Sequence, residues 1–565
     1  MLRATGLIVL LIVVMGCAPP SAPPGQRDAA DSQPAARAQR TLVIGMGREI
    51  DTLGRFGDRP DNETHDIVQA GLVQRNQITF KEQPWMAEEF PSTDKGTWRV
   101  NPDGTMVTTY RLRSNIRWHD GTPFSTKDFV FGWEVTMDDK TAVRDRGEAQ
   151  LMDRLDTPDD RTLIIYWNRS NPRADRLFNN QLMALPRHLV EALIRSGDYD
   201  RFDNSPHWGR EFVGTGPYRV LDFQPGVSAE LQAFDDYFLG KPKIDRITLR
   251  IIADNNVMLT NVLTGDVHVT LRSSLTLETG FVAREQWEAM GQGRVIFQPV
   301  NWQWVNLSGM NPWFDDIRVR RAMLHAIDRE SLVQTLSRGV ETVVHAPLHP
   351  NRPQFPAADR VMAKYEYNVQ RAEQLLDEAG WRRGADGVRV NTQGERFVFD
   401  ARTVATRNEL VQLQAATIGY WNTVGARLEV NNLIERVNNS EEYRNRWPGA
   451  NWASHNILIE DWHDRYHSRT IPTEANRWRT DNVSRWINPQ KDAVIDEMVA
   501  TLDRSRWDQL VVEFVRLFTQ DLPHLPLNYT SEVTSVSKGL VGVHPRNESG
   551  GENSRTWNIH EWEWQ

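Results

Sequence analysis

Cysteine is nearly absent from this chain of 565 residues, in which Cys17 is the only one. A chain with one cysteine has no intramolecular disulfide, so packing alone must hold its domains together. Long apolar runs are missing too, because Gly6 to Met15 is shorter than the roughly 20 residues that a membrane-spanning helix needs. A basic excess is also missing: the net charge of −9 argues against a nucleic-acid partner, whose phosphates need basic side chains.

The N-terminal segment has the organisation of an export signal. Arg3 precedes the apolar run, whose length fits the core of a signal peptide, about 7 to 15 residues. Val14-Met15-Gly16-Cys17 follows and resembles the lipobox of bacterial lipoproteins. The resemblance implies cleavage before Cys17 and acylation of its thiol, with more than one acyl chain giving a stable anchor. The alternative is a secretory signal that happens to contain a cysteine.

The composition changes after this signal. Residues 17–40 are rich in proline, alanine and serine and lack periodicity, which predicts a flexible tether. The globular part begins at "TLVIGMG", Thr41 to Gly47, and is long enough for two or three domains. The chain contains 21 tryptophans, whose large rigid rings suit both hydrophobic cores and pockets that stack ligands.

Short strands and amphipathic helices alternate in the globular part and predict a mixed α/β fold. "WHDG" after a predicted strand indicates a turn, which assigns no catalytic role to His119. Ser125 to Asp128 predicts the capping box of a helix. One helix is predicted from Asp315 or Asp316 to a stop at Gly339, and another from a cap at Asn368 to a stop at Gly380.

The sequence contains no recognisable catalytic or metal-binding signature. His463 and His467 lie four residues apart in "HDRYH", but no glutamate stands beside the first, as the zinc-protease pattern requires. We therefore predict no catalytic residue, no metal and no cofactor.

A set of segments, taken in order, resembles the peptide/oligopeptide class (family 5) of solute-binding proteins of ABC transporters. The segments are "YRLRSNIRWHDGTPFSTKDFVF", "GTGPYRV", "LTGDVHV", "NPWFDDIRVRRAMLHAIDRESLV", "NVQRAEQLLDEAGW", "TVGARLEV" and "LPLNYTSEV". The resemblance implies an α/β, periplasmic-binding-protein-like fold of two lobes, with a ligand cleft between them and an extra subdomain inserted in the first lobe.

The resemblance also implies where the chain divides. Residues 1–16 are the expected lipoprotein signal peptide and 17–40 the lipid-anchored tether. Lobe I is expected over 41–300 plus 527–565, with the inserted subdomain at about 66–212, and lobe II over 301–526. Two strands are expected to cross between the lobes, near Gln298 to Trp304 and near Leu525 to Tyr529.

The function implied by the resemblance is binding and not catalysis. The expected protein captures di- or oligopeptides by closing its lobes and delivers them to an ABC import permease. It is expected to be a monomer in the periplasm or cell envelope, held at the outer face of a membrane by its lipid. Alternatives are an oligosaccharide or another small solute as ligand and, in a different class, an exported glycoside hydrolase with two carboxyl groups about 5 to 9 Å apart.

The candidate ligand-binding residues lie in two stretches. Asp461 falls about where the family has an acidic residue that takes the peptide amino group, with Glu460 and Asp464 as competitors. The family's acidic-proline tail is missing there, so three solvated loop acids are the alternative. Trp302, Trp304 and Asn306 share one face of an extended segment at the predicted crossing. Stacking on a ligand is expected of these tryptophans or of Trp462, and core packing is the alternative.

Overall fold

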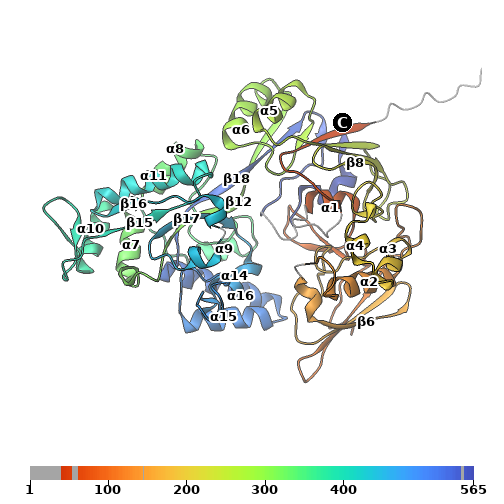
Figure 1. Cartoon of the computed structure of the whole chain (residues 1–565), viewed down its shortest axis with the longest axis horizontal. Coiled ribbons are helices and arrows are strands. Elements are labelled where there is room, and N and C mark those ends of the chain that lie inside the picture. The colour runs from red at the N-terminus through yellow and green to blue at the C-terminus, as the bar shows by residue number, and fades with distance from the viewer. Residues whose placement is uncertain (1–39, 54–61, 144–145, 439, 549–552) are drawn as a thin grey trace, which may run out of the picture. The chain divides into compact units, whose positions relative to one another are not determined.

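The computed structural model describes residues 40–53, 62–143, 146–438, 440–548 and 553–565 (Figure 1). The predicted signal peptide, Cys17 and the tether up to residue 39 lie outside these residues. Within the described ranges, no helix is both long enough and apolar enough to cross a membrane.

One mixed sheet of ten strands runs through both halves of the molecule. The strands β1 and β15 pair with their neighbours in parallel, and the other adjacent strands are antiparallel. From one edge to the other the order is β16 (Arg427–Val430), β15 (Val398–Arg402), β17 (Ala450–Asn456), β12 (Gly293–Leu307), β18 (Leu525–Ser537), β11 (Val269–Thr270), β1 (Thr41–Met46), β10 (Arg246–Ile251), β9 (Ser228–Ala233) and β8 (Tyr218–Gln224).

The remaining strands form four small sheets. A four-stranded antiparallel sheet has the order β4 (Trp98–Val100), β5 (Met106–Arg111), β7 (Thr162–Trp167) and β6 (Met152–Asp159). The two-stranded sheets pair β2 (Val73–Arg75) with β3 (Glu82–Pro84), β13 (Arg382–Arg383) with β14 (Arg389–Val390), and β19 (Leu540–Val541) with β20 (Glu563–Trp564).

Helices connect and cover these strands. The α-helices are α1 (Asn62–Val68), α2 (Thr126–Met137), α3 (Arg187–Arg195), α4 (Tyr199–Asp203), α5 (Asn255–Thr264), α6 (Leu277–Ala283), α7 (Ile317–His325), α8 (Arg329–Ser337), α9 (Phe355–Asp359), α10 (Val369–Glu378), α11 (Asn408–Thr423), α12 (Glu435–Asn438), α13 (Glu441–Asn445), α14 (Trp462–Tyr466), α15 (Pro489–Ala500) and α16 (Arg504–Asp521). Short helical turns lie at Gly147–Leu151, Pro206–Trp208, Arg284–Glu288, Pro312–Phe314, Ile459–Asp461, Ser468–Thr470 and Arg555–Glu561.

The hydrophobic cores divide the described chain into two parts. Two clusters contain only residues between Trp302 and Tyr529, and we call this part lobe II. The other clusters are built from residues between Leu42 and Phe297 together with the C-terminal residues from Val533 onward, and we call this part lobe I. Among the described residues, Leu502 is the one lobe II side chain that packs, partly buried, against a lobe I cluster.

The two longest strands, β12 and β18, pass from one lobe to the other side by side (Figure 1). They pair antiparallel from Gly293 and Ser537 in lobe I to Val305 and Leu525 in lobe II. The register shifts between Pro299 and Asn301, where proline has no N–H to donate to the ladder. Both segments predicted to cross between the lobes lie within these strands, and the irregularity lies at the crossing.

Local helix signals were partly predictable. The capping box of Ser125 and Asp128 is confirmed, and so are the cap at Asn368 and the turn at Asp120-Gly121. Asp316, not Asp315, caps the helix that follows it. The single helix predicted up to Gly339 is wrong, because the carboxylate of Asp328 accepts a hydrogen bond from the Ser331 N–H at 2.9 Å and starts a second helix, α8.

Candidate functional site

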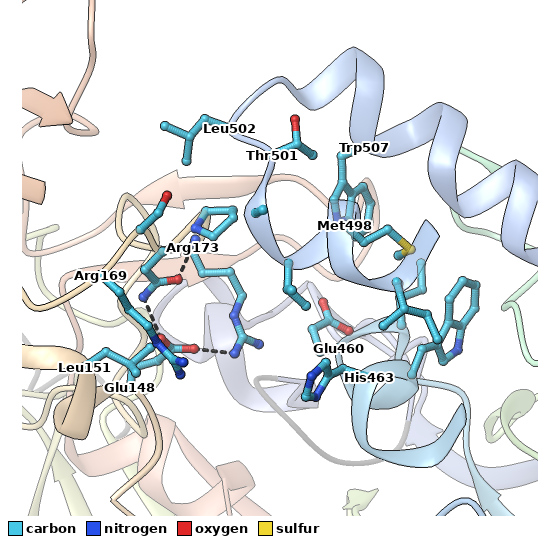
Figure 2. A pocket seen from close by; sticks show the side chains of 18 of the residues that line it. Glu148, Leu151, Arg169, Arg173, Glu460, His463, Met498, Thr501, Leu502 and Trp507 are labelled. Carbon is cyan, nitrogen blue, oxygen red and sulfur yellow. Dashed lines mark hydrogen bonds and ion pairs between the residues drawn. The ribbon is translucent and has the colours of Figure 1, made fainter. Parts of the chain in front are cut away.

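A cavity of about 560 Å³ lies between the two lobes. Its wall from lobe I is formed by residues 148–176, and its wall from lobe II by residues 459–507 (Figure 2). The residues that line it are Glu148, Leu151, Arg169, Ser170, Asn171, Pro172, Arg173 and Arg176 in lobe I, and Ile459, Glu460, Trp462, His463, Asp464, Arg469, Ile495, Met498, Val499, Ala500, Thr501, Leu502, Arg504 and Trp507 in lobe II.

The lobe II wall consists of packed helices. The side chain of Asn488 caps α15 by accepting from two backbone N–H groups, and Asp503 does the same for α16. The two helices pack against each other, and the buried side chain of Met498 lies at their junction with the cavity. The ring of Trp462 is stacked on Phe514 of α16 with the ring centroids 4.0 Å apart. Hydrophobic packing therefore fixes this wall.

The lobe I wall is an irregular segment held by polar contacts. Beyond β7 the chain turns at Pro172, and Glu148 anchors the turn from the neighbouring helical turn. The carboxylate of Glu148 accepts a hydrogen bond from the side-chain amide of Asn171 at 2.6 Å and forms an ion pair with Arg173. The side chain of Asn171 also accepts from the backbone N–H of Arg173 at 2.9 Å. Hydrogen bonds and charge therefore fix this wall.

Glu460 lies where the lobes meet and forms ion pairs with residues of both lobes. Its carboxylate lies 3.5 Å from a guanidinium nitrogen of Arg75 in lobe I and 3.4 Å from one of Arg352 in lobe II. Burial acts to raise the pKa of Glu460, but the guanidiniums of Arg352 and Arg75 outweigh it and lower the pKa to about 2. Arg352 in turn donates to the buried Glu548, which belongs to the C-terminal part of lobe I, at 2.6 Å. Glu460 is therefore an ionised member of a cross-lobe network.

The predicted anchor Asp461 lies next to the cavity but is not among its lining residues. Its carboxylate is 3.5 Å from Arg465 on the following turn, and one third of its side chain, 33%, is exposed. Burial of the remainder raises the pKa of Asp461, while Arg465 acts in the opposite direction. The competitors Glu460 and Asp464 do line the cavity.

The predicted aromatic residues separate into two groups. Trp462 lines the cavity. Trp302 and Trp304 are buried and stacked on each other, with ring centroids 4.5 Å apart, in the lobe II core near His524. Asn306, on the same strand face, is buried and its side-chain amide donates to the carbonyl of Val483 at 3.4 Å. The structure brings Trp462 and Glu460 together at the cavity and places Trp302, Trp304 and Asn306 in the interior of lobe II.

Several cavity residues lie in stretches whose sequence does not indicate a binding role. The arginines of "NRSNPRADR" follow a strand in an irregular segment, a pattern that reads as solvated surface. Met498 and Trp507 belong to helical stripes that equally predict a core position. An arginine-rich turn directly after a strand was the one available clue, because turns at strand ends often carry binding residues.

The histidines singled out by the sequence have local partners. His463 contacts the carboxylate of Asp464 at 2.9 Å, and within the described residues no group of three or more potential metal ligands gathers. Buried His119 accepts a hydrogen bond from the Gly214 N–H at 3.1 Å, and its other ring nitrogen contacts the Gly216 carbonyl at 3.0 Å. Burial lowers the pKa of His119 to about 4, so it is a neutral link between two loops.

The sequence around this two-lobe cavity is similar to that of a known protein family. Residues 81–470 match the model of the bacterial extracellular solute-binding proteins, family 5, middle region. The chain belongs to this family. The oligopeptide-binding protein AppA of Bacillus subtilis is 22% identical over 480 residues, which are 81% of each chain.

Solved structures of family members share the fold. The oligopeptide-binding protein of Thermus thermophilus, solved with a pentapeptide, superposes with a TM-score of 0.69 at 24% identity, covering 93% of this chain and 96% of that one. NikZ of Campylobacter jejuni, solved with Ni(L-His), gives 0.68 at 19% identity, covering 92% and 99%. The family 5 chain described here therefore has the two-lobed α/β fold of periplasmic binding proteins, as the resemblance implied. CtaP of Listeria monocytogenes, described as an ABC transporter substrate-binding protein, gives a TM-score of 0.73 at 18% identity, covering 93% and 99%.

Proposed function

We propose that this solute-binding protein captures di- or oligopeptides between its lobes and delivers them to an ABC import permease. The observation that carries the proposal is the 560 Å³ cavity lined by both lobes, a volume within the range of about 300 to 1,000 Å³ of ligand pockets. The match with an oligopeptide-binding protein over most of both chains supports a peptide as ligand.

The proposal includes the domain organisation predicted from the sequence. Lobe I comprises 41–300 plus 527–565, with a subdomain inserted at about 66–212, and lobe II comprises 301–526. Closure occurs about β12 and β18, the two strands of the described chain that pass between the lobes, whose ladder is irregular at Pro299. Closure excludes water from the ligand and is stabilised by contacts that form only when both walls meet it.

The predicted amine anchor is retained in this proposal. Glu460 faces the cavity, but two guanidiniums already hold its carboxylate. Among the described residues, Arg465 at 3.5 Å is the one ion-pair partner of Asp461, so the Asp461 carboxylate is more available to a peptide ammonium than that of Glu460. Asp461→Ala is expected to weaken binding of peptides with a free amino group and to leave N-acetylated peptides unaffected.

Lipid anchoring at Cys17 is the second part of the proposal. A multiply acylated Cys17 would hold the protein at the outer face of a membrane, next to the permease. Metabolic labelling with a radioactive fatty acid tests this: label on the wild-type protein and none on Cys17→Ala is expected. Label that persists in the variant would contradict it.

Thermal-shift measurements with di- to pentapeptides and with oligosaccharides test the ligand class. A ligand present at 100 times its dissociation constant stabilises the folded protein by roughly 2.7 kcal/mol. Stabilisation by peptides of varied sequence is expected, since main-chain hydrogen bonds supply affinity independent of side chain. Stabilisation by sugars alone would indicate that the ligand is a carbohydrate and not a peptide. Release of reducing sugar would indicate that the protein hydrolyses its ligand.

A further inference from the structure

Arg169 is the one cavity arginine for which the described residues provide no partner. The other four are each within ion-pair distance of a carboxylate: Arg173 of Glu148, Arg176 and Arg504 of Asp175, and Arg469 of Asp496. The side chain of Arg169 is exposed on the lobe I wall, and Figure 2 shows it beside Arg173. A charged guanidinium is therefore available to a ligand at this wall.

Two of the three carboxylates that line the cavity, those of Glu148 and Glu460, are held by arginines. Glu148 is held by Asn171 and Arg173, and Glu460 by Arg75 and Arg352. Asp464 contacts the ring of His463, and this hydrogen bond lowers the pKa of Asp464. A ligand ammonium at Glu148 or Glu460 would compete with the arginines that hold these carboxylates, whereas an anion at Arg169 would displace no described partner.

The opposite wall is apolar. Met498, Leu502 and Trp507 lie across the cavity from the arginines (Figure 2). Leu502 and Trp507 are only partly buried, so a ligand can still remove apolar surface from water here, which is worth roughly 25 cal/mol per Å². Among the described residues, the cavity thus presents one unpaired guanidinium, that of Arg169, facing one apolar surface.

We propose that the cavity binds an apolar group that carries a carboxylate. The carboxylate accepts hydrogen bonds from the Arg169 guanidinium, and the apolar group lies against Met498 and Trp507. A carboxylate matches the single guanidinium of Arg169, because a planar monoanion can accept two parallel hydrogen bonds from it. The inference rests on the proposed function and names the end of the ligand that this cavity takes.

Two kinds of ligand carry a carboxylate next to an apolar group. One is the C-terminus of a peptide whose last residue is apolar, with its amino end outside the cavity toward Asp461. The other is a free apolar monocarboxylate such as octanoate. In both cases the guanidinium and carboxylate make two parallel hydrogen bonds, the strongest geometry for this pair.

Isothermal titration calorimetry on the purified protein tests the inference with four probes. The probes are Ala-Ala-Ala-Phe with a free carboxylate, the same peptide as its C-terminal amide, its N-acetylated form, and octanoate. The variant is Arg169→Gln. The matched control is Arg99→Gln, which removes an exposed arginine of β4 that has no side-chain partner among the described residues and does not line the cavity.

Amidation and Arg169→Gln are each expected to weaken binding of the tetrapeptide about 10- to 100-fold, the range for a charge-assisted contact. On the variant, amidation should cause no further loss, because both changes remove the same contact. Arg99→Gln should bind like the wild-type protein. Equal binding of the acid and the amide by the wild-type protein would overturn the inference.

The probes also separate this inference from the proposed function. Equal binding of the peptide acid and the peptide amide supports peptide capture and overturns the carboxylate site. Octanoate binding that requires Arg169, with no peptide binding, supports the carboxylate site and overturns peptide capture. Binding of neither class overturns both.

Discussion

The two walls of the cavity differ in what holds their side chains in place. The lobe II wall is made of capped helices whose residues, such as Trp462, are packed into a core. The lobe I wall is an irregular segment positioned by Glu148 and its two partners. One wall therefore contributes a fixed apolar surface and the other a set of charges, so substitutions in the two walls should destabilise the protein by different amounts.

The largest effect is expected from Trp462→Ala in the packed wall. Removing a buried indole that is stacked on Phe514 at 4.0 Å should lower the free energy of unfolding by about 3 to 5 kcal/mol. Urea denaturation measures the loss. Trp507→Ala is the matched variant on the same wall: its half-buried ring should cost about 1 to 2 kcal/mol and mainly weaken ligand binding. Equal losses for both tryptophans would contradict the difference in packing.

Glu460→Gln tests the residue at which the two walls meet. The pKa of Glu460 is about 2, below its unfolded value of about 4.5. The folded state therefore binds fewer protons than the unfolded state between these values, and the stabilisation is present above pH 4.5 and lost as the pH falls toward 2. The wild-type protein should exceed Glu460→Gln in free energy of unfolding by about 1 to 3 kcal/mol at pH 7.

The same comparison at pH 3 supplies the control for Glu460. There the difference between the two proteins should be much smaller, because at pH 3 the unfolded wild-type chain has already bound the proton that the folded state, with its pKa of about 2 at Glu460, has not. A difference that stays constant from pH 7 to pH 3 would show that the charge of Glu460 is not what joins Arg75 and Arg352.

Glu148→Gln weakens the polar wall. The carboxylate of Glu148 is almost fully buried, with 4% of its side chain exposed, so Arg173 loses a buried partner. We expect a loss of about 1 to 2 kcal/mol in the free energy of unfolding, measured by chemical denaturation. Glu89→Gln is the control, because its exposed pair with Lys95 should contribute less than about 1 kcal/mol. A loss no larger than the control's would mean that the segment is held by something other than Glu148.

The smallest effect is expected at the ion pair that joins the walls. Arg504 at the start of α16 lies 2.9 Å from Asp175 in lobe I, and about half of the Arg504 side chain, 48%, is exposed. A double-mutant cycle of Arg504→Gln and Asp175→Asn should give a coupling of about 0.2 to 1 kcal/mol that decreases with added salt. The exposed pair Arg506 and Glu497, within lobe II, serves as the reference cycle. A salt-independent coupling above 2 kcal/mol would assign the pair a dominant role in closure.

Much of the architecture could be predicted from local sequence. A cap such as Asn368 or the box of Ser125 and Asp128 satisfies backbone N–H groups within one turn, so the signal and the structure occupy the same few residues. The break before α8 was missed because Asp328 also fits the exposed face of one long helix. The crossing strands followed from ordered landmarks that resemble a known family.

The candidate site could be predicted only in part. The stretch around residues 460–462 was identified, and two of its residues, Glu460 and Trp462, line the cavity. Trp302 and Trp304 were candidates for stacking on a ligand, as Trp462 was, yet they stack on each other in the interior of lobe II. A tryptophan in an amphipathic pattern predicts burial, but the pattern does not specify whether another side chain or a ligand covers the ring.

The sequence by itself determined the elements, their order and the family of this protein, because hydrogen bonds within turns and hydrophobic periodicity are local properties. Only the tertiary structure decided which charges are neutralised and which remain free. Arg169 and Arg173 lie four residues apart in one segment, but Arg173 meets Glu148 and Arg169 meets no described partner. Residues about 300 positions apart form the two walls, so their pairing depends on how β12 and β18 join the lobes. No local pattern encodes that juxtaposition.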